Sequence, residues 1–463
     1  MANGPLTGIR VVDLSRVFAM PFAASYMADM GAEVIKIDTC DTRFMDTTRI
    51  LNGPYPDNDP GELYWEQGGT FQTLNRGKRS LTLDLRSEAA IEVLKNLMRL
   101  SDVVMENFTP RVMQRFGLDY ASLKSVKPDL IMVSNTGYGH SGPWSNFGAM
   151  ASALEPTHGS GAFTGYLTPE SDGRPALADV PNKIGNSYTD FLASMTAQLA
   201  VLASLMHRAR TGKGMWIDLA MYQVGVSFLG EGVLEYAYNR HRTRRIGNRD
   251  EGMAPHGCYP CRGDDEWAVI AVRDDADWQS LCRVLEQPSL AAESRFASAE
   301  SRLRHQGQLD DIVSRWTSTM GQYEVMERLQ AVGVPAGPVL NARGLLTDPH
   351  IRARGLFEGV EHPPETGLGH REYLGRGWKL SDSEVKMRGP APMLGEANEY
   401  VLGEIMGLEA AEIHSLRESG AIGETAVGAR IPEAPSLERQ VELGWTVSYD
   451  PDFRQILGDS DPS

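Results

Sequence analysis

Short apolar runs alternate with helix-like stretches over the first 140 residues. Ile9–Leu14 and Glu33–Ile37 are rich in β-branched residues, and Pro21–Met30 between them has a helical composition. Two strands joined through a helix form a βαβ unit, in which the strands run parallel. The pattern continues with a strand at Leu81–Leu85, a helix at Ser87–Leu100, and strands at Val103–Met105 and Leu130–Ser134. We therefore predict an α/β fold with a doubly wound parallel sheet and a ligand crevice at the carboxyl ends of its strands.

The rest of the chain changes character several times. Residues 137–190 are glycine-rich and loop-like, as functional loops often are. Phe191–His207 is apolar or small almost all round, which predicts a helix buried on every side. Tyr238–Arg249 carries five arginines and has the composition of a linker. A buried-type strand at Trp267–Val272, followed by helices, predicts a smaller α/β domain.

These changes divide the chain into five predicted segments. They are the first part of a large domain (1–225), a linker (226–249), a small α/β domain (250–345), a return segment that completes the large domain (346–425) and an irregular C-terminal extension (426–463). The length of 463 residues agrees with two domains, because one hydrophobic core rarely organises so long a chain.

The charge balance is acidic, with 45 Lys and Arg against 61 Asp and Glu. Nucleic acids and anionic membranes are bound through basic surfaces, so we expect neither as a partner. Four cysteines are too few for a disulfide framework in this chain, which is typical of the reducing cytosol. The first residues lack the basic and apolar regions of a signal peptide, and we expect a cytoplasmic protein.

Several cofactor sites lack their signature. The turn after the first strand, Ser15–Pro21, has none of the glycines of a dinucleotide-binding loop, and no Walker-type phosphate loop occurs. Cys258 and Cys261 form a single C-x-x-C pair, whereas a zinc site needs further ligands at suitable spacing. The pair also precedes a strand, whereas a redox pair opens a helix. We expect neither a metal nor a prosthetic group.

Basic residues cluster at Arg76, Lys78 and Arg79, just before the predicted strand at Leu81–Leu85. Arg86 closes that strand, and Arg115 lies on a following helix. In an acidic protein such residues could hold phosphates. By composition alone, solvated surface positions explain them at least as well.

Asp190 opens the predicted buried helix and has two interpretations. Asp at a helix start is most often an N-cap, and Thr189 could take that place instead. A carboxylate at the N-terminus of a dry helix could also be a nucleophile, because the helix dipole keeps it ionised. Asp179 is a second carboxylate in the same loop. Composition alone favours the cap.

The ordered motifs of the chain resemble those of the class III CoA-transferases, the CaiB/BaiF family that includes formyl-CoA transferase and crotonobetainyl-CoA transferase. The resemblance covers about residues 6 to 425. It implies a Rossmann-like large domain, a smaller α/β domain and a dimer of two interlocked, ring-like chains. The motifs are Gly8–Arg16, Gly31–Lys36, Asn75–Leu85, Asp102–Phe108, Asn135–Gly139, Gly142–Pro143 and Pro392–Glu396.

The resemblance also implies roles for single residues. In the family an aspartate precedes a Thr-Gly-x-Gly turn by about 21 residues, and Asp190 lies 21 residues before Thr211. Asp190, not Asp179, is then the nucleophile that accepts an acyl group from an acyl-CoA, and a carboxylic acid is the second substrate. Coenzyme A is part of a substrate, and no prosthetic group is implied. The residues expected to contact coenzyme A or its thioester are Ala19, Leu83, Leu85, Arg86, Asn107, Phe108, Arg115, Gly137 and Tyr138.

The chain departs from the family pattern at three points. Thr39 stands where several members have an arginine against coenzyme A, Phe18 replaces a glutamine of formyl-CoA transferase, and no tetraglycine lid occurs. These departures argue against oxalate or formate as substrates. Aromatic residues near the expected pocket indicate a bulkier acyl group; they are Phe18, Tyr138, Trp144 and Phe163. The arginines of 240–249 could bind a dicarboxylate such as succinate, although we favour a solvated linker.

Two other functions remain open. An acyl-CoA racemase of the same fold would pair a histidine with Asp190 to exchange an α-proton. The loop Asn146–Gly159 lacks the Gly-His-Asp-x-Asn-Tyr motif of that subfamily, although His158 lies 32 residues before Asp190. A non-catalytic subunit of a hetero-oligomeric transferase would agree with Phe18 and Thr39, but not with the retention of Asp190. We expect a homodimer, with a hetero-oligomer as the alternative.

Overall fold

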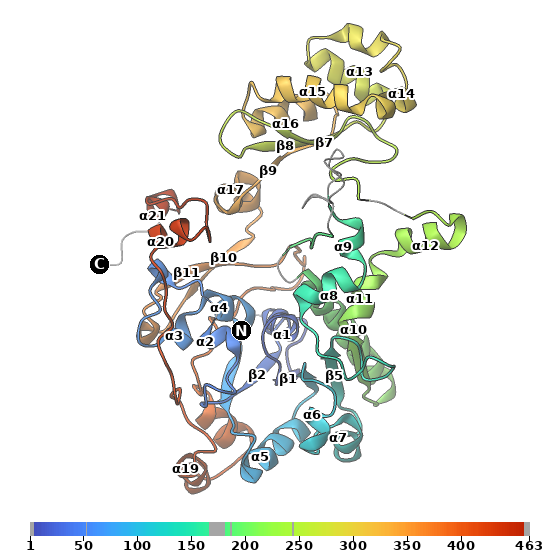
Figure 1. The fold of residues 1–463 in the computed structure, drawn as a ribbon. Coiled ribbons are helices and arrows are strands. Elements are labelled where there is room, and N and C mark those ends of the chain that lie inside the picture. Colours follow the sequence, from blue (N-terminus) through green and yellow to red (C-terminus); the bar gives the residue numbers. More distant parts are fainter. Residues whose placement is uncertain (1–3, 52, 166–180, 186–187, 243–244, 458–463) are drawn as a thin grey trace. The chain divides into compact units, whose positions relative to one another are not determined.

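The computed structural model of the protein describes residues 4–51, 53–165, 181–185, 188–242 and 245–457, and divides the chain into two compact units (Figure 1). The larger unit comprises residues 1–160, 183–234 and 355–463, and the smaller unit comprises 161–182 and 235–354. Part of the segment predicted as a linker, 226–249, is helical, because α12 spans Gly230–Asn239.

A six-stranded parallel sheet forms the centre of the larger unit, with the strand order β3-β2-β1-β4-β5-β6. The strands are β1 (Arg10–Asp13), β2 (Glu33–Asp38), β3 (Arg79–Thr82), β4 (Val103–Glu106), β5 (Ile131–Thr136) and β6 (Trp216–Ala220). The chain order reverses between β1 and β4, and open parallel sheets bind ligands at such a switch point. The predicted α/β class with a parallel sheet is confirmed, while β6 has no counterpart in the sequence prediction.

Helices cover both faces of this sheet. On one face α1 (Ala19–Asp29) and α10 (Tyr188–Thr211) pack on Val11, Val34, Val103 and Ile131. On the other face α5 (Glu88–Arg99) and α19 (Ala410–Glu418) pack on the alternate strand positions, which include Val12, Ile35 and Val104. The strands are therefore apolar on both sides, as buried parallel strands are.

The remaining helices of the larger unit are short. They are α2 (Thr47–Ile50), η1 (Pro56–Asn58), α3 (Tyr64–Gln67), α4 (Gly69–Asn75), α6 (Val112–Arg115), α7 (Tyr120–Val126), α8 (Ala151–Thr157), α11 (Met221–Ser227), η4 (Pro364–Thr366), η5 (Tyr400–Ile405), α20 (Leu437–Glu442) and α21 (Phe453–Leu457). The described part of the predicted irregular extension, 426–457, thus contains two helical segments.

The helix α10 is not buried on every side, contrary to the prediction. Ala193, Ala197 and Val201 face the core, but Leu199 and Met206 are 69% and 65% exposed. By length and hydropathy α10 could cross a membrane, yet it packs along α1, α8 and α11 as a core helix does. The sequence pattern missed the exposed face because apolar side chains lie all round the helix.

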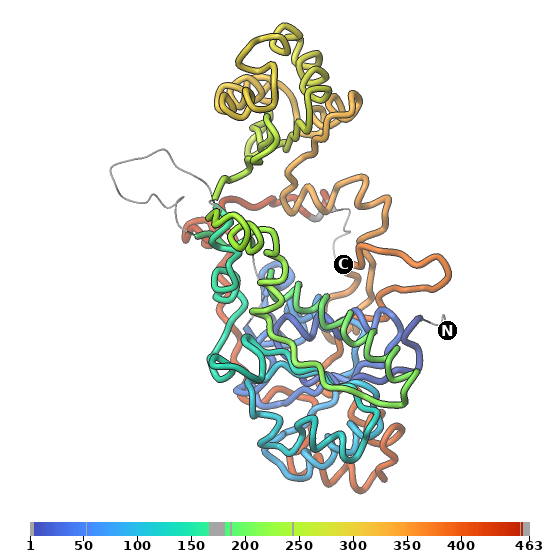
Figure 2. Tube along the Cα trace, turned by 90° about the vertical axis from the view of Figure 1, so that its right-hand side faces the viewer, coloured from blue at the N-terminus to red at the C-terminus, as the bar shows by residue number. Residues whose placement is uncertain are grey.

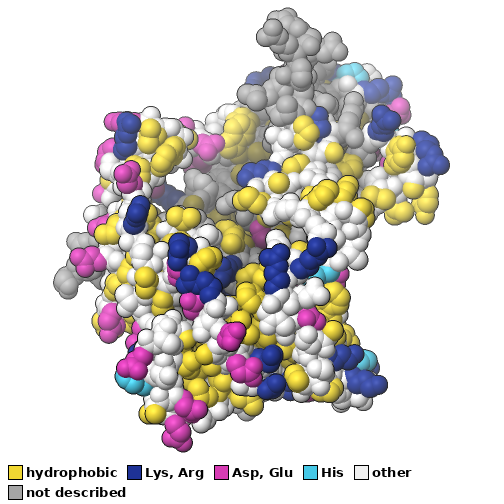
Figure 3. Space-filling model, turned by 60° about the horizontal axis from the view of Figure 1, so that its bottom comes forward, with side chains coloured by type: hydrophobic (Ala, Val, Ile, Leu, Met, Phe, Trp, Pro, Cys, Tyr) yellow, Lys and Arg dark blue, Asp and Glu magenta, His cyan; other side chains and the backbone are white. Residues whose placement is uncertain are grey.

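The C-terminal return segment lies against the N-terminal part of the larger unit (Figure 2). The backbone N–H of Ala397 donates to the carbonyl of Ser80, and the N–H of Asp84 donates to the carbonyl of Ala421. A two-stranded hairpin, β10 (Phe357–Glu361) and β11 (His370–Leu374), precedes these contacts. On the face shown in Figure 3, basic and acidic side chains are interspersed, with hydrophobic side chains exposed between them.

The smaller unit has a three-stranded antiparallel sheet, β7-β8-β9, and its own apolar core around Trp278 and Phe296. The strands are β7 (His256–Pro260), β8 (Trp267–Ala271) and β9 (Ala336–Val339). The helices wholly within it are α13 (Asp275–Val284), η3 (Pro288–Ala292), α14 (Ala299–Arg304), α15 (Gln306–Thr317), α16 (Gln322–Gln330), α17 (Ala342–Thr347) and α18 (Pro349–Ala353), while α9 (Ser160–Phe163) begins at its boundary.

Candidate active site

A large cavity of about 750 Å³ opens at the carboxyl ends of β1, β4 and β5 in the larger unit. Asp190 lies in the first turn of α10 and lines this cavity. The helix already includes Tyr188 and Thr189, so Asp190 is a first-turn residue and not the N-cap. The helix dipole at this position favours the ionised carboxylate. Asp179, the alternative carboxylate, lies outside the described residues.

Four of the predicted coenzyme A contacts line the same cavity as Asp190. Asn107 and Phe108 follow β4, and Gly137 and Tyr138 follow β5. A Cβ atom at Gly137 would collide with the Cβ of Ala149, so only glycine fits where the two ends of the connection between β5 and α8 meet. Ala19 is buried at the start of α1, next to Val17 and Phe18 of the cavity wall. The parallel sheet thus brings together residues that are far apart in the sequence.

The turn after β1 enters the cavity wall in a strained conformation. Val17 has φ +69°, in the left-handed region that β-branched residues avoid, and its side chain is 38% exposed. Its N–H donates to Asp46 Oδ1 at 3.2 Å. The ammonium of Lys36 binds Asp46 Oδ2 at 3.1 Å and the carbonyl of Ser15 at 3.0 Å. Buried charges therefore hold the backbone from Ser15 to Val17.

The basic cluster before β3 lies mostly inside the protein. Arg76 and Lys78 are 1% and 4% exposed, which excludes both predicted roles for them, a phosphate cradle and a solvated surface. Lys78 binds Asp13 at 2.7 Å, and Arg76 binds Asp29 at 3.0 Å. Burial lowers the pKa of Lys78 to about 8, although the Asp13 carboxylate opposes that shift. Removal of one partner of such a buried ion pair would leave an uncompensated charge inside the protein and destabilise the fold.

Leu83, Leu85 and Arg86 line a separate cavity of about 210 Å³, which Phe108 also borders. Arg86 is half-exposed and already binds Asp84 at 2.8 Å and Asp41 at 3.1 Å. Phosphates would have to compete with these carboxylates for its guanidinium. Arg115 is exposed on α6 and does not appear among the described residues that line either cavity.

Arg16 is a candidate that the sequence reasoning did not single out. Its guanidinium lies 5.6 Å from the centroid of the Phe108 ring, and the side chain lines the smaller cavity. Burial lowers the pKa of Arg16, although Asp46 and Asp38 oppose that shift. The sequence feature that could have indicated Arg16 is its position, since it follows the first strand and lies in the turn that leads to Ala19.

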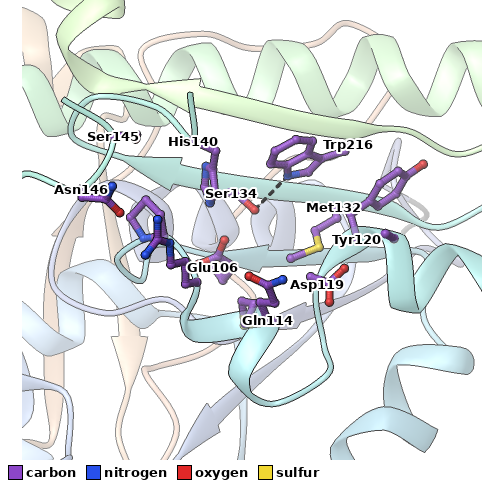
Figure 4. A pocket seen from close by; sticks show the side chains of 14 residues that line it. Glu106, Gln114, Asp119, Tyr120, Met132, Ser134, His140, Ser145, Asn146 and Trp216 are labelled. Carbon is purple, nitrogen blue, oxygen red and sulfur yellow. Dashed lines mark hydrogen bonds between the residues drawn. The ribbon is translucent and has the colours of Figure 1, made fainter. Parts of the chain in front are cut away.

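A third cavity, of about 430 Å³, lies beyond the loop at Pro110 (Figure 4). Glu106 at the end of β4 is 1% exposed, and its Oε2 accepts a hydrogen bond from the N–H of Phe108 at 2.8 Å. Burial raises the pKa of Glu106, although the hydroxyl of Ser134 opposes the rise. The Trp216 indole donates to Ser134 Oγ at 3.0 Å. Glu106 therefore fixes the backbone from which the Asn107–Phe108 contacts project.

His158, the histidine that a racemase would need, packs behind the first turn of α10. Its Nε2 lies 3.0 Å from Thr189 Oγ1, and its ring fills the space that a side chain at Gly225 would need. The residue is 5% exposed and is not among the described residues that line the large cavity. Burial lowers the pKa of His158, although Glu155 opposes the shift.

Three comparisons with known proteins agree. The model of CoA-transferase family III matches residues 6–398. The succinate–glutarate CoA-transferase of Agrobacterium fabrum is 31% identical over 406 residues, which are 88% of this chain and 96% of that protein. The succinyl-CoA–L-malate CoA-transferase beta subunit of Chloroflexus aurantiacus is 31% identical over 422 residues, 90% and 98% of the two chains.

A crystal structure of a CAIB/BAIF family protein from Brucella suis has a TM-score of 0.75 and 30% sequence identity to this chain, and the match covers 87% of this chain and 100% of that one. The family match at residues 6–398 includes the whole parallel sheet and Asp190. The chain therefore belongs to CoA-transferase family III and is an enzyme.

Proposed function

We propose that the enzyme moves coenzyme A from an acyl-CoA to an acceptor carboxylic acid, with Asp190 as the covalent nucleophile. The observation that carries the proposal is the carboxylate in the first turn of α10, which lines the large cavity together with the loops after β1, β4 and β5. Family membership supports the reaction class. A carboxylate at a helix N-terminus stays ionised at neutral pH, as attack on a thioester requires.

The reaction that we propose has a donor half and an acceptor half, and each half consists of two acyl-transfer steps. The Asp190 carboxylate attacks the thioester carbonyl, the C–S bond breaks, and coenzyme A leaves as a thiolate from a mixed anhydride. The thiolate attacks the aspartyl carbonyl, the donor acid leaves as a carboxylate, and an aspartyl-CoA thioester remains. An acceptor carboxylate then reverses both steps and restores Asp190. No proton is transferred, so the protein has to exclude water and retain the thiolate.

Backbone N–H groups of the loop after β5 are the expected donors to the developing oxyanion. Within Gly137–Gly139, the N–H of Gly139 donates to Thr136 Oγ1 at 2.9 Å. We therefore restrict this role to Gly137 and Tyr138, which line the cavity. Asn107 and Phe108 are proposed to lie along the pantetheine, and Arg86, Arg115 and Arg16 toward the phosphates.

A homodimer of interlocked chains is the assembly that we propose. The exposed apolar face of α10, with Met195, Leu199 and Met206, supports an interface on this helix. The Chloroflexus relative is named as a subunit, so a hetero-oligomer is the alternative. Light scattering of the purified chain at low micromolar concentration distinguishes them, because a stable monomer of about 51 kDa contradicts the homodimer.

The test of the function replaces Asp190 by Asn, which keeps the shape of the side chain. We expect a folded enzyme that does not transfer coenzyme A, and a wild-type Asp190 that hydroxylamine or borohydride modifies after incubation with acyl-CoA, as detected by peptide mass spectrometry. Glu88→Gln, an exposed first-turn carboxylate of α5, is the control and should keep full activity. Near-normal turnover of Asp190→Asn, with deamidation excluded, would contradict the mechanism.

A further inference from the structure

Apart from Asp190, the described residues that line the large cavity are of two chemical kinds, here called its neutral polar part and its apolar part. The polar part contains hydroxyl and amide side chains, which suit the amide groups of a pantetheine arm; they are Thr70, Asn107, Thr109, Asn135, Thr136, Ser145 and Ser152. The apolar part contains Val17, Phe18, Leu51, Phe147, Met150, Leu154 and Met221. When the thioester lies at Asp190 and the pantetheine arm contacts the polar residues, the apolar residues are left to contact the acyl group.

Four of these apolar side chains are exposed to water although they border a cavity. Leu51 and Met150 are 67% and 73% exposed, and Val17 and Phe147 are 38% and 58% exposed. They come from the turn after β1, the end of α2 and the loop before α8. Apolar surface of this kind is favourable to cover, so it suits a ligand with an apolar body.

An aromatic group extends this apolar wall. Tyr138 packs edge-on against Trp144 at 5.6 Å between ring centroids, and Trp144 stacks on Phe147 at 6.3 Å. Phe147 and Tyr138 both line the cavity. Because these rings already pack against one another, their side chains lose little further conformational entropy when a ligand binds.

The charge of the lining residues also favours an apolar acyl group. Among the described residues that line this cavity, Asp190 is the one acidic or basic side chain. A second carboxylate on the acyl group would lose its hydration without a cationic partner among these described lining residues. Arg249 of the arginine-rich segment binds Asp310, and Arg240 donates to the carbonyls of Tyr236 and Ala237.

We infer that the acyl group transferred by this enzyme is uncharged and apolar, an alkyl chain or an aromatic-substituted chain, and not the acyl group of a dicarboxylic acid. The inference rests on the proposed function and specifies the substrate class of the same site. The apolar wall around Val17, Phe147 and Met150 selects this class, and the neutral polar part accommodates the pantetheine arm.

Identity exchange tests the inference without knowledge of the natural acceptor. The enzyme is incubated with hexanoyl-CoA and labelled hexanoate, with 3-phenylpropanoyl-CoA and labelled 3-phenylpropanoate, or with succinyl-CoA and labelled succinate, and label entering the CoA ester is measured. We expect kcat/KM for at least one of the two monocarboxylic acids to exceed that for succinate by at least about tenfold. Succinate exchange that is as fast or faster overturns the inference and leaves the proposed function intact. If none of the three acids exchanges, the proposed function is itself overturned, and the inference with it.

A charge placed in the apolar wall provides the matched variant. Met150→Arg should shift the succinate-to-hexanoate ratio of kcat/KM toward succinate by about tenfold, because the guanidinium supplies the missing partner for the second carboxylate. Leu100→Arg adds the same charge at a 47% exposed position after α5, away from the residues of the cavity wall, and should leave the ratio unchanged. An unchanged ratio in Met150→Arg contradicts the inference.

Discussion

The side-chain amide of Asn107 binds both backbone polar groups of Arg16. The N–H of Arg16 donates to Asn107 Oδ1 at 2.9 Å, and Asn107 Nδ2 donates to the Arg16 carbonyl at 2.8 Å. The two residues follow β4 and β1, which are neighbours in the sheet but far apart in the sequence. This pair of hydrogen bonds joins the two loops that flank Asp190 and holds the backbone next to the left-handed Val17.

Removal of this amide should loosen the site before any ligand binds. We expect Asn107→Ala to lower the free energy of unfolding by about 1 kcal/mol or somewhat more, because two partly buried backbone groups lose their partner. The KM for acyl-CoA should rise as well, since the turn after β1 then loses its fixed position. Urea unfolding of the ligand-free enzyme and steady-state kinetics measure the two effects.

The control for Asn107→Ala is Asn239→Ala. Asn239 lies exposed at the end of α12, where its amide binds Glu235, and its removal should leave both quantities almost unchanged. If Asn107→Ala changes KM but not stability, Asn107 acts through the ligand alone and the positioning role is wrong.

Val17→Gly should have opposite effects on stability and activity. A left-handed conformation costs an L-residue about 1–2 kcal/mol, whereas glycine adopts it freely. We expect the free energy of unfolding to stay equal or to rise by up to about 1 kcal/mol, while kcat/KM falls because part of the cavity wall is lost.

Val126→Gly gives the comparison for Val17→Gly. Val126 is exposed in the last turn of the helix α7, where glycine should lower the free energy of unfolding by about 0.5–1 kcal/mol. Equal losses in the two variants, measured by urea unfolding, would mean that the backbone at Val17 is not strained.

The arginines proposed to contact the phosphates should affect binding and not chemistry. We expect Arg86→Ala and Arg115→Ala to raise the KM for CoA esters by about tenfold with kcat mostly unchanged, because phosphate contacts stabilise ground and transition states alike. Arg99→Ala, in a surface pair with Glu92, should leave KM unchanged. A normal KM in both variants would exclude these side chains from the phosphates and leave Arg16 as the remaining candidate.

The buried His362 should make the enzyme less stable in acid. Burial, together with the nearby Arg371, lowers the pKa of His362 to about 4, and its Nε2 lies 2.9 Å from the Tyr373 hydroxyl. Between pH about 6.5 and 4 the unfolded chain therefore binds a proton here that the folded chain does not. The contribution to the free energy of unfolding is full above pH about 6.5, and up to about 3 kcal/mol of it is lost as the pH falls to about 4.

Urea unfolding at pH 7.5 and 4.5 checks this assignment. We expect the difference between the two pH values to be smaller in His362→Gln than in the wild type. His414→Gln, at an exposed position on α19, should keep the wild-type difference. An equal difference in all three proteins would show that His362 titrates normally.

The strands of the sheet were predictable from local pattern where apolar residues are contiguous. β1, β2, β4 and β5 lie within or next to the runs that the sequence shows. The sequence analysis missed β6, Trp216–Ala220, because Asp218 interrupts its apolar residues. Trp216 and Asp218 in the first part of the strand are exposed. Periodicity reports burial of an element, so an edge strand with mixed neighbours leaves a weak signal.

Motifs placed Asp190, Asn107, Phe108, Gly137 and Tyr138 in one predicted site, and the structure brings these five to one cavity. Their chemical roles stay predictions. The partner of Asn107 could not be foreseen, because the sequence separates Asn107 from Arg16 and no pattern couples a loop amide to a distant backbone. The same holds for Lys78 and Asp13, whose pairing turns an apparent surface charge into a buried one.

The sequence by itself determined the first five strands of the sheet and the helices α1 and α5 between them, the parallel α/β class and the residues with reactive side chains, because these depend on short-range periodicity and residue type. Only the tertiary structure decided which side of α10 is exposed, that Arg76 and Lys78 are buried, and that Val17 is held with φ +69° at the cavity. The physical reason is that burial, ion pairing and backbone strain depend on partners supplied by distant segments, which meet only when the sheet has formed.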